Sequence, residues 1–222
     1  MLKRTSLDYV NNYLSNKKKW KILDLGCGYS ANINANYIAD VIDLSEFYKN
    51  KNFTHIKTKK LPFKNKFFDF VITSHVIEHV NDLNFFISEI QRIGHRGYIE
   101  LPTRLEDNLV LHKNNIKDHK WTFHYDDNKK ILIANKKKSL IEPFVTLGLL
   151  NEKLRKYYRE SLVIELFWEK KIEYKKITAG SAIIRNRLLF ITVFKKYCSY
   201  YLRKNKLSLI FFLFFMAYFF FI

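Results

Sequence analysis

The sequence predicts an α/β fold built on a doubly wound, mostly parallel sheet, and three observations predict it. Short apolar runs typical of strands alternate with stretches of helical periodicity through the first half of the chain. The strongest runs are residues 20–25, which lead into a glycine turn, and residues 68–73. This alternation is typical of βαβ units. The chain has 222 residues, of which 48% are hydrophobic, so it can bury one substantial core.

The elements of the first half follow in chain order. Residues 5–16 read as an amphipathic helix. Strands are expected at four short runs, 20–25, 38–43, 53–57 and 68–73. A loop at 58–66 precedes the last of them. A helix at 82–93 has Asp82 near its start, where a carboxylate suits the helix dipole. A strand at 97–101 then stops at Pro102.

The second half carries weaker signals. Residues 131–135 are expected to form a strand. Residues 162–168 are expected to form a hairpin with the segment that follows, with Glu165 alternating outward. Residues 181–204 read as a helix.

The chain divides into one domain and a tail. Because no linker rich in proline, glycine or serine interrupts the chain, residues 1–194 are predicted to form a single domain. Its cofactor half is residues 1–103 and its acceptor half is residues 104–194. Residues 195–222 differ sharply in composition and form the tail.

The glycine turn predicts a nucleotide-type cofactor site. Gly26, Cys27 and Gly28 follow the strand at 20–25, and the next strand is expected to end at Asp43. Glycines let backbone approach a ligand, and a strand-end acid accepts hydrogen bonds from ribose hydroxyls, although Asp43 would also serve as a simple cap. Cys27 is small enough to fit the turn. In an open parallel sheet the loop that begins at Ser74 lies on the same rim.

Asp24 decides between two classes of cofactor. Gly26, Gly28 and Ala31 fit a loose dinucleotide pattern, so the glycines alone do not discriminate. A carboxylate two residues before the first glycine would repel the pyrophosphate of NAD and attract the ammonium and sulfonium of S-adenosylmethionine. The charge therefore favours S-adenosylmethionine. The alternative is that Asp24 only caps the turn through backbone N–H groups.

Three longer stretches resemble one family. They are LDLGCG, DVIDLSE and LPFKNKFFDFVITSHVIEHVND, in this order within residues 20–102. Together they resemble the class I S-adenosylmethionine-dependent methyltransferases of the type 11 group, which implies a Rossmann-like sheet. GYIELPT and HKW resemble a subgroup often encoded among glycan-biosynthesis enzymes. The chain departs from the family pattern at Ser30, which replaces the usual third glycine, and in the short Gly28–Asp43 segment, whose helix must be short or missing.

The resemblance implies roles for single residues. Leu44 would lie against adenine, and Leu61 matches a segment that flanks adenine, although core packing explains Leu61 nearly as well. His75 lies where the family places residues near the transferred methyl group, and the pKa of histidine suits proton removal from a hydroxyl acceptor. His75 would equally serve to orient the loop. Glu78 and His79 read as residues that orient that loop.

No metal site is predicted. Several histidines and acids gather in one stretch, His112, Asp118, His119, His124, Asp126 and Asp127. The spacings between these histidines, seven and five residues, match no pattern of metal ligands with a defined geometry.

The charge and cysteine content bound the partners and the compartment. A net charge of +18 would attract nucleic acid, anionic lipid or acidic glycans. The lysines are dispersed and no nucleic-acid-binding module is recognised, so a nucleic-acid substrate is not predicted. Cys27 and Cys198 give no disulfide framework. The first 14 residues lack the apolar run of a signal peptide, so a cytoplasmic setting is expected.

The tail predicts attachment to a membrane. Residues 207–222 carry no charge and would span about 24 Å as a helix, short of the roughly 30 Å hydrocarbon core. A basic collar precedes this run, formed by Lys195, Lys196, Arg203, Lys204 and Lys206. Because the run is apolar on every face, we expect an apolar C-terminal helix attached to the inner face of a membrane. Internal burial and packing on a partner are the alternatives.

The sequence therefore predicts a methyltransferase that uses S-adenosylmethionine. Its acceptor is expected to be a small molecule, a glycan, or a lipid-linked or quinone-like molecule at the membrane. One alternative is a NAD-type oxidoreductase or epimerase. The other is a non-catalytic membrane-associated scaffold whose cofactor site was lost with the short Gly28–Asp43 segment.

Overall fold

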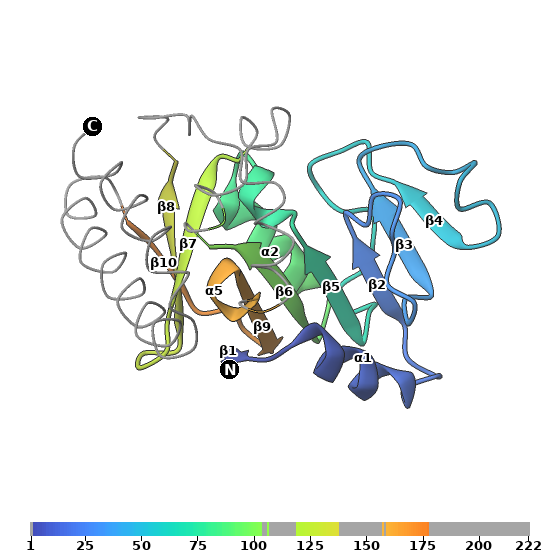
Figure 1. Cartoon of the computed structure of the whole chain (residues 1–222). Helices are drawn as coiled ribbons and strands as arrows, with labels where there is room; N and C mark the ends of the chain where they lie inside the picture. The colour runs from blue at the N-terminus through green and yellow to red at the C-terminus, as the bar shows by residue number, and fades with distance from the viewer. Residues whose placement is uncertain (1, 104–105, 107–118, 138–156, 158, 178–222) are drawn as a thin grey trace, which may run out of the picture. The chain divides into compact units, whose positions relative to one another are not determined.

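The computed structural model of the chain describes residues 2–103, 106, 119–137, 157 and 159–177 (Figure 1). All of them belong to one compact unit, Met1–Thr178. The elements in chain order are β1 (Leu2–Arg4), α1 (Leu7–Ser15), β2 (Ile22–Leu25), β3 (Tyr37–Asp40), β4 (Asn52–His55), β5 (Phe70–Ser74), the 3-10 turn η1 (Ile77–His79), α2 (Leu83–Ile93), β6 (Arg96–Pro102), β7 (Trp121–Asp126), β8 (Ile131–Lys136), α5 (Arg159–Leu162), β9 (Val163–Glu169) and β10 (Tyr174–Ile177).

Seven strands form the main sheet, in the order β1-β9-β6-β5-β2-β3-β4. Every neighbouring pair from β6 to β4 is parallel. Strand β9 runs antiparallel to both β6 and β1. A second sheet has the order β10-β8-β7. The predicted mostly parallel, Rossmann-like α/β fold is confirmed.

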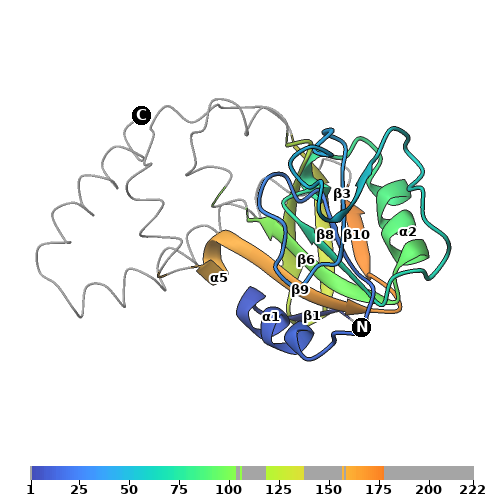
Figure 2. The ribbon, with the colours of Figure 1, turned by 90° about the vertical axis from the view of Figure 1, so that its right-hand side faces the viewer.

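The two faces of the main sheet bury different side chains. Leu23 packs with Ile87 and Ile90 of α2, whereas its neighbour Ile22 packs with Val10 and Leu14 of α1. Successive side chains of a strand point to opposite faces, so each face is covered by one of these helices. Figure 2 shows α1 and α2 on opposite sides of the sheet. Because both faces are covered, every residue of β2 is buried.

Helix α2 begins close to the predicted residue 82, whereas α1 begins at Leu7, two residues later than predicted. The side chain of Ser6 accepts a hydrogen bond from the N–H of Tyr9 at the start of α1. The side chain of Asp82 accepts one from the N–H of Phe85, at 3.1 Å, at the start of α2. An N-terminal cap of this kind satisfies an N–H that has no partner within the helix.

Strand β3, predicted at 38–43, is shorter than predicted. Strand β3 ends at Asp40, not at Asp43. The side chain of Asp40 accepts a hydrogen bond from the N–H of Ile42, so the backbone bends directly after the strand. As expected from the short Gly28–Asp43 segment, no helix lies between β2 and β3.

The predicted hairpin after residue 162 is wrong. Strand β9 enters the main sheet, while β10 pairs in parallel with β8 in the second sheet. The outward orientation predicted for Glu165 is also wrong, because this residue is buried. Its strand lies between β6 and β1, and its carboxylate accepts hydrogen bonds from the N–H of Leu7 and the hydroxyl of Tyr98.

Several predicted features lie outside the described residues. They include the helix at 181–204, the apolar tail at 207–222 and part of the acceptor half at 104–194. Of the helices in the described part of the chain, none has both the length and the apolar character that a membrane crossing needs.

Candidate functional site

The glycine turn after β2 adopts a backbone that favours glycine at two positions. Gly26 has a φ of +76° and Gly28 a φ of +52°. The N–H of Gly26 donates to the carbonyl of Ala39, at 2.7 Å. A Cβ on Gly26 would lie 2.4 Å from a methyl carbon of Val76, whereas a Cβ on Gly28 would meet no atom within 4 Å. The turn thus packs against the loop after β5 at Gly26 and faces open space at Gly28.

Asp24 is buried below this turn. One of its carboxylate oxygens accepts a hydrogen bond from the N–H of Asn32, at 2.7 Å. Burial raises the pKa of Asp24 to about 6, against the opposing effect of the Asn32 hydrogen bond, and the nearby Asp40 raises it further. Asp24 therefore does cap the local loop, which is the alternative that the sequence left open. The cap does not exclude a cofactor role.

Two acids follow each other at the end of β3, and their environments differ. Asp40 is buried, and its two oxygens accept hydrogen bonds from the N–H groups of Gly28 and Ile42, both at 2.9 Å. The side chain of Asp43 is 55% exposed. Hydrogen bonds from the side chain and backbone of Ser45 lower the pKa of Asp43, which keeps it ionised. Of the two acids, Asp43 is the one available to a ligand.

A loop takes the place of the helix that usually follows a glycine turn. The hydroxyl of Tyr48 donates to the carbonyl of Gly28, at 2.9 Å, and accepts from the N–H of Ala31, at 3.1 Å. The side chain of Asn32 donates to the side chain of Asn11 in α1, at 2.8 Å. These bonds fix the loop without a helix. Sequence reasoning did not single out Tyr48, Asn32 or Asp40, whose roles depend on partners in other elements.

The remaining residues predicted to contact the cofactor lie mostly in the core. Leu44 is buried against Ile38 and Tyr48. Leu61 is also buried, and its N–H donates to Glu89 at 2.7 Å. Their contact with adenine stays a prediction.

Cys27 is partly exposed in the glycine turn. Burial of its thiol, together with the nearby carboxylates of Asp24 and Asp40, raises the pKa of Cys27 to about 12. The thiol is therefore neutral at physiological pH, which suits a residue chosen for its size.

His75 follows Ser74, the last residue of β5, and has a left-handed backbone with a φ of +54°. Its N–H donates to the carbonyl of Glu100, at 3.0 Å. Its ring nitrogens lie 3.2 Å from Glu78 Oε1 and 3.2 Å from Glu100 Oε1. Burial alone would lower the pKa of His75, but the hydrogen bonds to these two carboxylates raise it to about 9. This geometry favours the loop-orienting role.

His75 contacts a network in which buried Glu100, Glu165 and Tyr98 meet the partly exposed Arg159. Arg159 Nη2 lies 2.9 Å from Glu100 Oε1, and Arg159 Nε lies 3.2 Å from Glu165 Oε2. The hydroxyl of Tyr98 lies 2.5 Å from Glu100 and 2.7 Å from Glu165. Although burial opposes ionisation, the hydrogen bonds of His75 and Tyr98 lower the pKa of Glu100 to about 2. The network keeps Glu100 charged and fixes the ring of His75.

One group of described residues has the composition of a metal site. Glu78, His79 and His119 place one potential ligand atom each within 4.8 Å of one another. In the sequence, His119 stands out only beside its neighbours in the chain, of which His112 and Asp118 lie outside the described residues. The fold instead brings His119 to the loop after β5.

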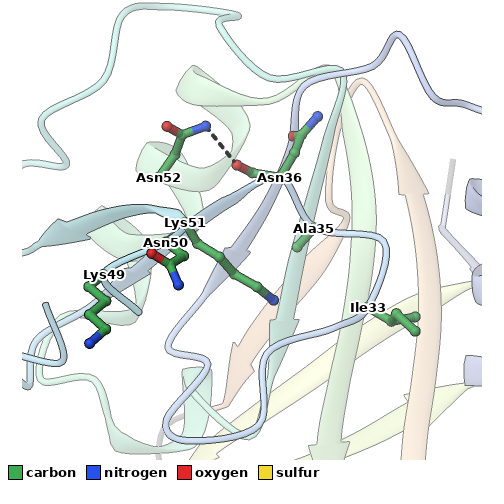
Figure 3. A pocket seen from close by; sticks show the side chains of 7 residues that line it. All are labelled: Ile33, Ala35, Asn36, Lys49, Asn50, Lys51 and Asn52. Carbon is green, nitrogen blue, oxygen red and sulfur yellow. Dashed lines mark hydrogen bonds between the residues drawn. The ribbon is translucent and has the colours of Figure 1, made fainter. Parts of the chain in front are cut away.

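A surface pocket of about 520 Å³ lies away from this rim (Figure 3). It is lined at the amino ends of β3 and β4, where the side chain of Asn52 donates to the carbonyl of Asn36 at 3.1 Å. A second pocket, of about 380 Å³, is lined by Thr58 and residues 60–64, including Leu61. The catalytic and cofactor-binding residues predicted at the glycine turn, at Asp43 and at Ser74–His75 line neither pocket.

Comparison of the sequence with known proteins gives a match to a protein family and a match to a curated protein. Residues 23–99 match a family described as "Methyltransferase domain", of the type 11 group. An uncharacterized protein of Methanocaldococcus jannaschii is 37% identical over 108 residues, which cover 43% of this chain and 45% of that protein. The chain thus spans less than half the length of this curated relative.

Solved structures resemble the chain at low sequence identity. A protein from Pyrococcus horikoshii aligns over 74% of this chain and 89% of its own, with 17% identity and a TM-score of 0.43. A putative S-adenosylmethionine dependent methyltransferase from Listeria monocytogenes aligns over 71% of this chain and 96% of its own, with 10% identity and a TM-score of 0.41.

Proposed function

We propose that the chain, whose residues 23–99 match the type 11 methyltransferase family, methylates an acceptor held beside the loop after β5. One observation carries the proposal. At the carboxyl ends of β2 and β3, the carboxylate of Asp40 accepts hydrogen bonds from backbone N–H groups, while Asp43 stays exposed and ionised. An open α/β sheet binds its ligands at this edge.

The residues of the rim fit S-adenosylmethionine. Asp43 can accept hydrogen bonds from the ribose hydroxyls, and the open space at Gly28 lets a ligand approach the backbone. Asp24 supplies a carboxylate near the positions of the ammonium and the sulfonium. When bound, S-adenosylmethionine supplies an electrophilic methyl group. The protein contributes alignment of the acceptor and exclusion of water.

His75 positions the acceptor loop in this proposal. Both of its ring nitrogens face carboxylates, so the ring is held in one orientation. For a hydroxyl acceptor His75 is the first candidate base, as the sequence suggests. Because its pKa is raised to about 9, the ring is protonated at neutral pH, so it would have to lose a proton and leave Glu78 or Glu100 before it could act as a base. A nitrogen acceptor that is already neutral needs no such step.

Calorimetric titration of the full chain tests the cofactor. S-adenosylmethionine and S-adenosylhomocysteine are expected to bind and NAD is not. Asp43→Asn should weaken binding by about tenfold or more, because a hydrogen bond to a charged group contributes about 1.5–3 kcal/mol. Glu173→Gln removes one exposed negative charge at the start of β10 and serves as the control.

Three results would contradict the proposal. Binding of NAD alone would favour an oxidoreductase or epimerase. No binding by a chain that unfolds cooperatively would favour the non-catalytic scaffold. Equal affinity of Asp43→Asn and the parent chain would remove Asp43 from the site.

The acceptor is a glycan, or a lipid-linked or quinone-like molecule, on the cytoplasmic face of a membrane. The support is the sequence of the tail, in which the basic collar precedes the apolar run at 207–222. The full chain is expected to sediment with vesicles that contain anionic lipid, and less with purely zwitterionic vesicles. Replacing the five basic residues of the collar by glutamine should reduce that binding. A chain that stays in solution with both kinds of vesicle would sink this part of the proposal.

A further inference from the structure

Two hydrogen bonds hold the start of β7 and the residue before it against the turn η1 and the residue after it. The N–H of Lys120 donates to the carbonyl of Glu78, at 2.7 Å. The indole N–H of Trp121 donates to the carbonyl of Val80, at 2.8 Å. His119 is therefore brought beside His79, and the centroids of their rings are 4.6 Å apart with an angle of 78° between the ring planes. One link comes from a backbone N–H and one from an indole N–H, and their acceptors lie on either side of His79 in the chain, which fixes this juxtaposition.

Glu78 is buried between these two histidines and His75, and its side chain is inaccessible to solvent. Its Oε1 faces a ring nitrogen of His75, at 3.2 Å. Its Oε2 is also buried, and it has no hydrogen-bond partner in the part of the chain that the structure describes. A buried carboxylate oxygen without a partner costs free energy, and a cation is the partner that such an oxygen favours.

The ligand atoms of Glu78, His79 and His119 all lie within 4.8 Å of one another. Two imidazoles and one carboxylate form a ligand set that suits zinc and neighbouring first-row divalent metals. Three protein ligands also leave a coordination position open to a non-protein ligand. The contact of His75 with Oε1 would orient the carboxylate, as second ligand shells commonly do.

We propose that Glu78, His79 and His119 bind one divalent metal ion of the zinc type. The site lies on the loop that carries His75, but its existence does not depend on methyl transfer. Magnesium and calcium prefer sites rich in oxygen ligands, and this site offers one carboxylate. It should therefore discriminate strongly against both.

The test is metal binding by the full chain, freed of metal with a chelator. Cobalt(II) is titrated and followed by its visible absorption, and zinc is then added to displace it. We expect one saturable equivalent. His119→Gln and Glu78→Gln should each weaken zinc binding by at least about tenfold. His95→Gln, which removes an exposed histidine outside the site, should bind as the parent chain does.

A second readout separates lost binding from lost folding. Zinc should raise the thermal unfolding midpoint of the parent chain and of His95→Gln, because a ligand of the folded state stabilises it. The same addition should raise the midpoint of His119→Gln clearly less, while that variant still unfolds cooperatively. The proposal is overturned if no saturable binding occurs, if both site variants keep the parent affinity, or if magnesium binds as tightly as zinc. It would survive a failure of S-adenosylmethionine to bind.

Discussion

The rim of the sheet has two halves, which differ from the sequence halves 1–103 and 104–194. The cofactor half of the rim is the glycine turn with its acids, and the acceptor half of the rim is the loop after β5 with the network around His75. These two halves order their polar groups by different means. Around the cofactor turn, Asp24 and Asp40 accept hydrogen bonds from backbone N–H groups, and Asp43 is left exposed. Around the acceptor loop, His75 and Glu100 bind mainly to other side chains, which come from β6, β9 and α5. The cofactor half therefore depends on the path of the backbone. The acceptor half depends on charge pairing between distant segments.

This difference predicts different responses to substitution. Changes in the cofactor turn should alter backbone geometry and ligand affinity together. Changes in the acceptor network should leave a buried charge without its partner, which lowers stability before it affects the cofactor.

The largest effect is expected where the two halves touch, at Gly26. Gly26→Ala places a side chain at a φ of +76°, which costs about 1–2 kcal/mol, and overpacks Val76, which costs about 1–3 kcal/mol more. Gly28→Ala should cost only the backbone part, because no atom lies near its Cβ. Urea unfolding measures both. Equal losses in the two variants would mean that the contact with Val76 contributes nothing.

Asp24 should give the cofactor half a pH-dependent stability. Its pKa is about 6 in the folded chain and 3.8 in the reference state, so the folded state binds more protons between these values. The free energy of unfolding contributed by Asp24 therefore falls as pH rises through this window, by at most about 3 kcal/mol. Urea unfolding from pH 4 to pH 7 should show a shallower decline in Asp24→Asn. If the free energy of unfolding falls equally with pH in the parent chain and in Asp24→Asn, the raised pKa of Asp24 is contradicted.

The backbone of the cofactor half of the rim could be predicted from the sequence because its signals are local, whereas the contacts of its residues with a cofactor stay predictions. The glycines, Asp24 and Asp43 occur within one short stretch, and the missing helix followed from its length. The one error there, the end of β3, arose because Asp40 bends the backbone through its own side chain. A strand-end acid and a turn-forming acid look alike in sequence.

The acceptor half could not be predicted because its partners are distant in sequence. Glu165 was placed on the surface from its alternation, yet its partner Tyr98 lies 67 residues away and becomes its neighbour only when β9 enters the sheet beside β6. His119 was compared with nearby histidines, whereas the fold pairs it with His79. A periodic pattern gives the face of a strand but not the strand that it pairs with.

Tyr98→Phe should separate stability from cofactor binding in the acceptor half. It removes the hydroxyl that lies between the buried carboxylates of Glu100 and Glu165, at 2.5 and 2.7 Å. Loss of this donor should lower the free energy of unfolding by about 1–3 kcal/mol. Calorimetry should show unchanged affinity for S-adenosylmethionine. A loss of affinity without a loss of stability would mean that this network belongs to the cofactor site.

Tyr48→Phe is the same chemical change in the cofactor half and should have the smallest effect on stability. The hydroxyl of Tyr48 connects the carbonyl of Gly28 to the N–H of Ala31. Both groups lie in a loop near solvent, where water can replace the lost bonds, so the free energy of unfolding should fall by only about 0.5–1.5 kcal/mol. Affinity for S-adenosylmethionine should nevertheless weaken, because the loop that replaces the helix loses its link to the turn. The opposite ranking of the two tyrosine variants, with Tyr98→Phe weakening the cofactor more, would reverse the division of the rim into a backbone-ordered half and a charge-paired half.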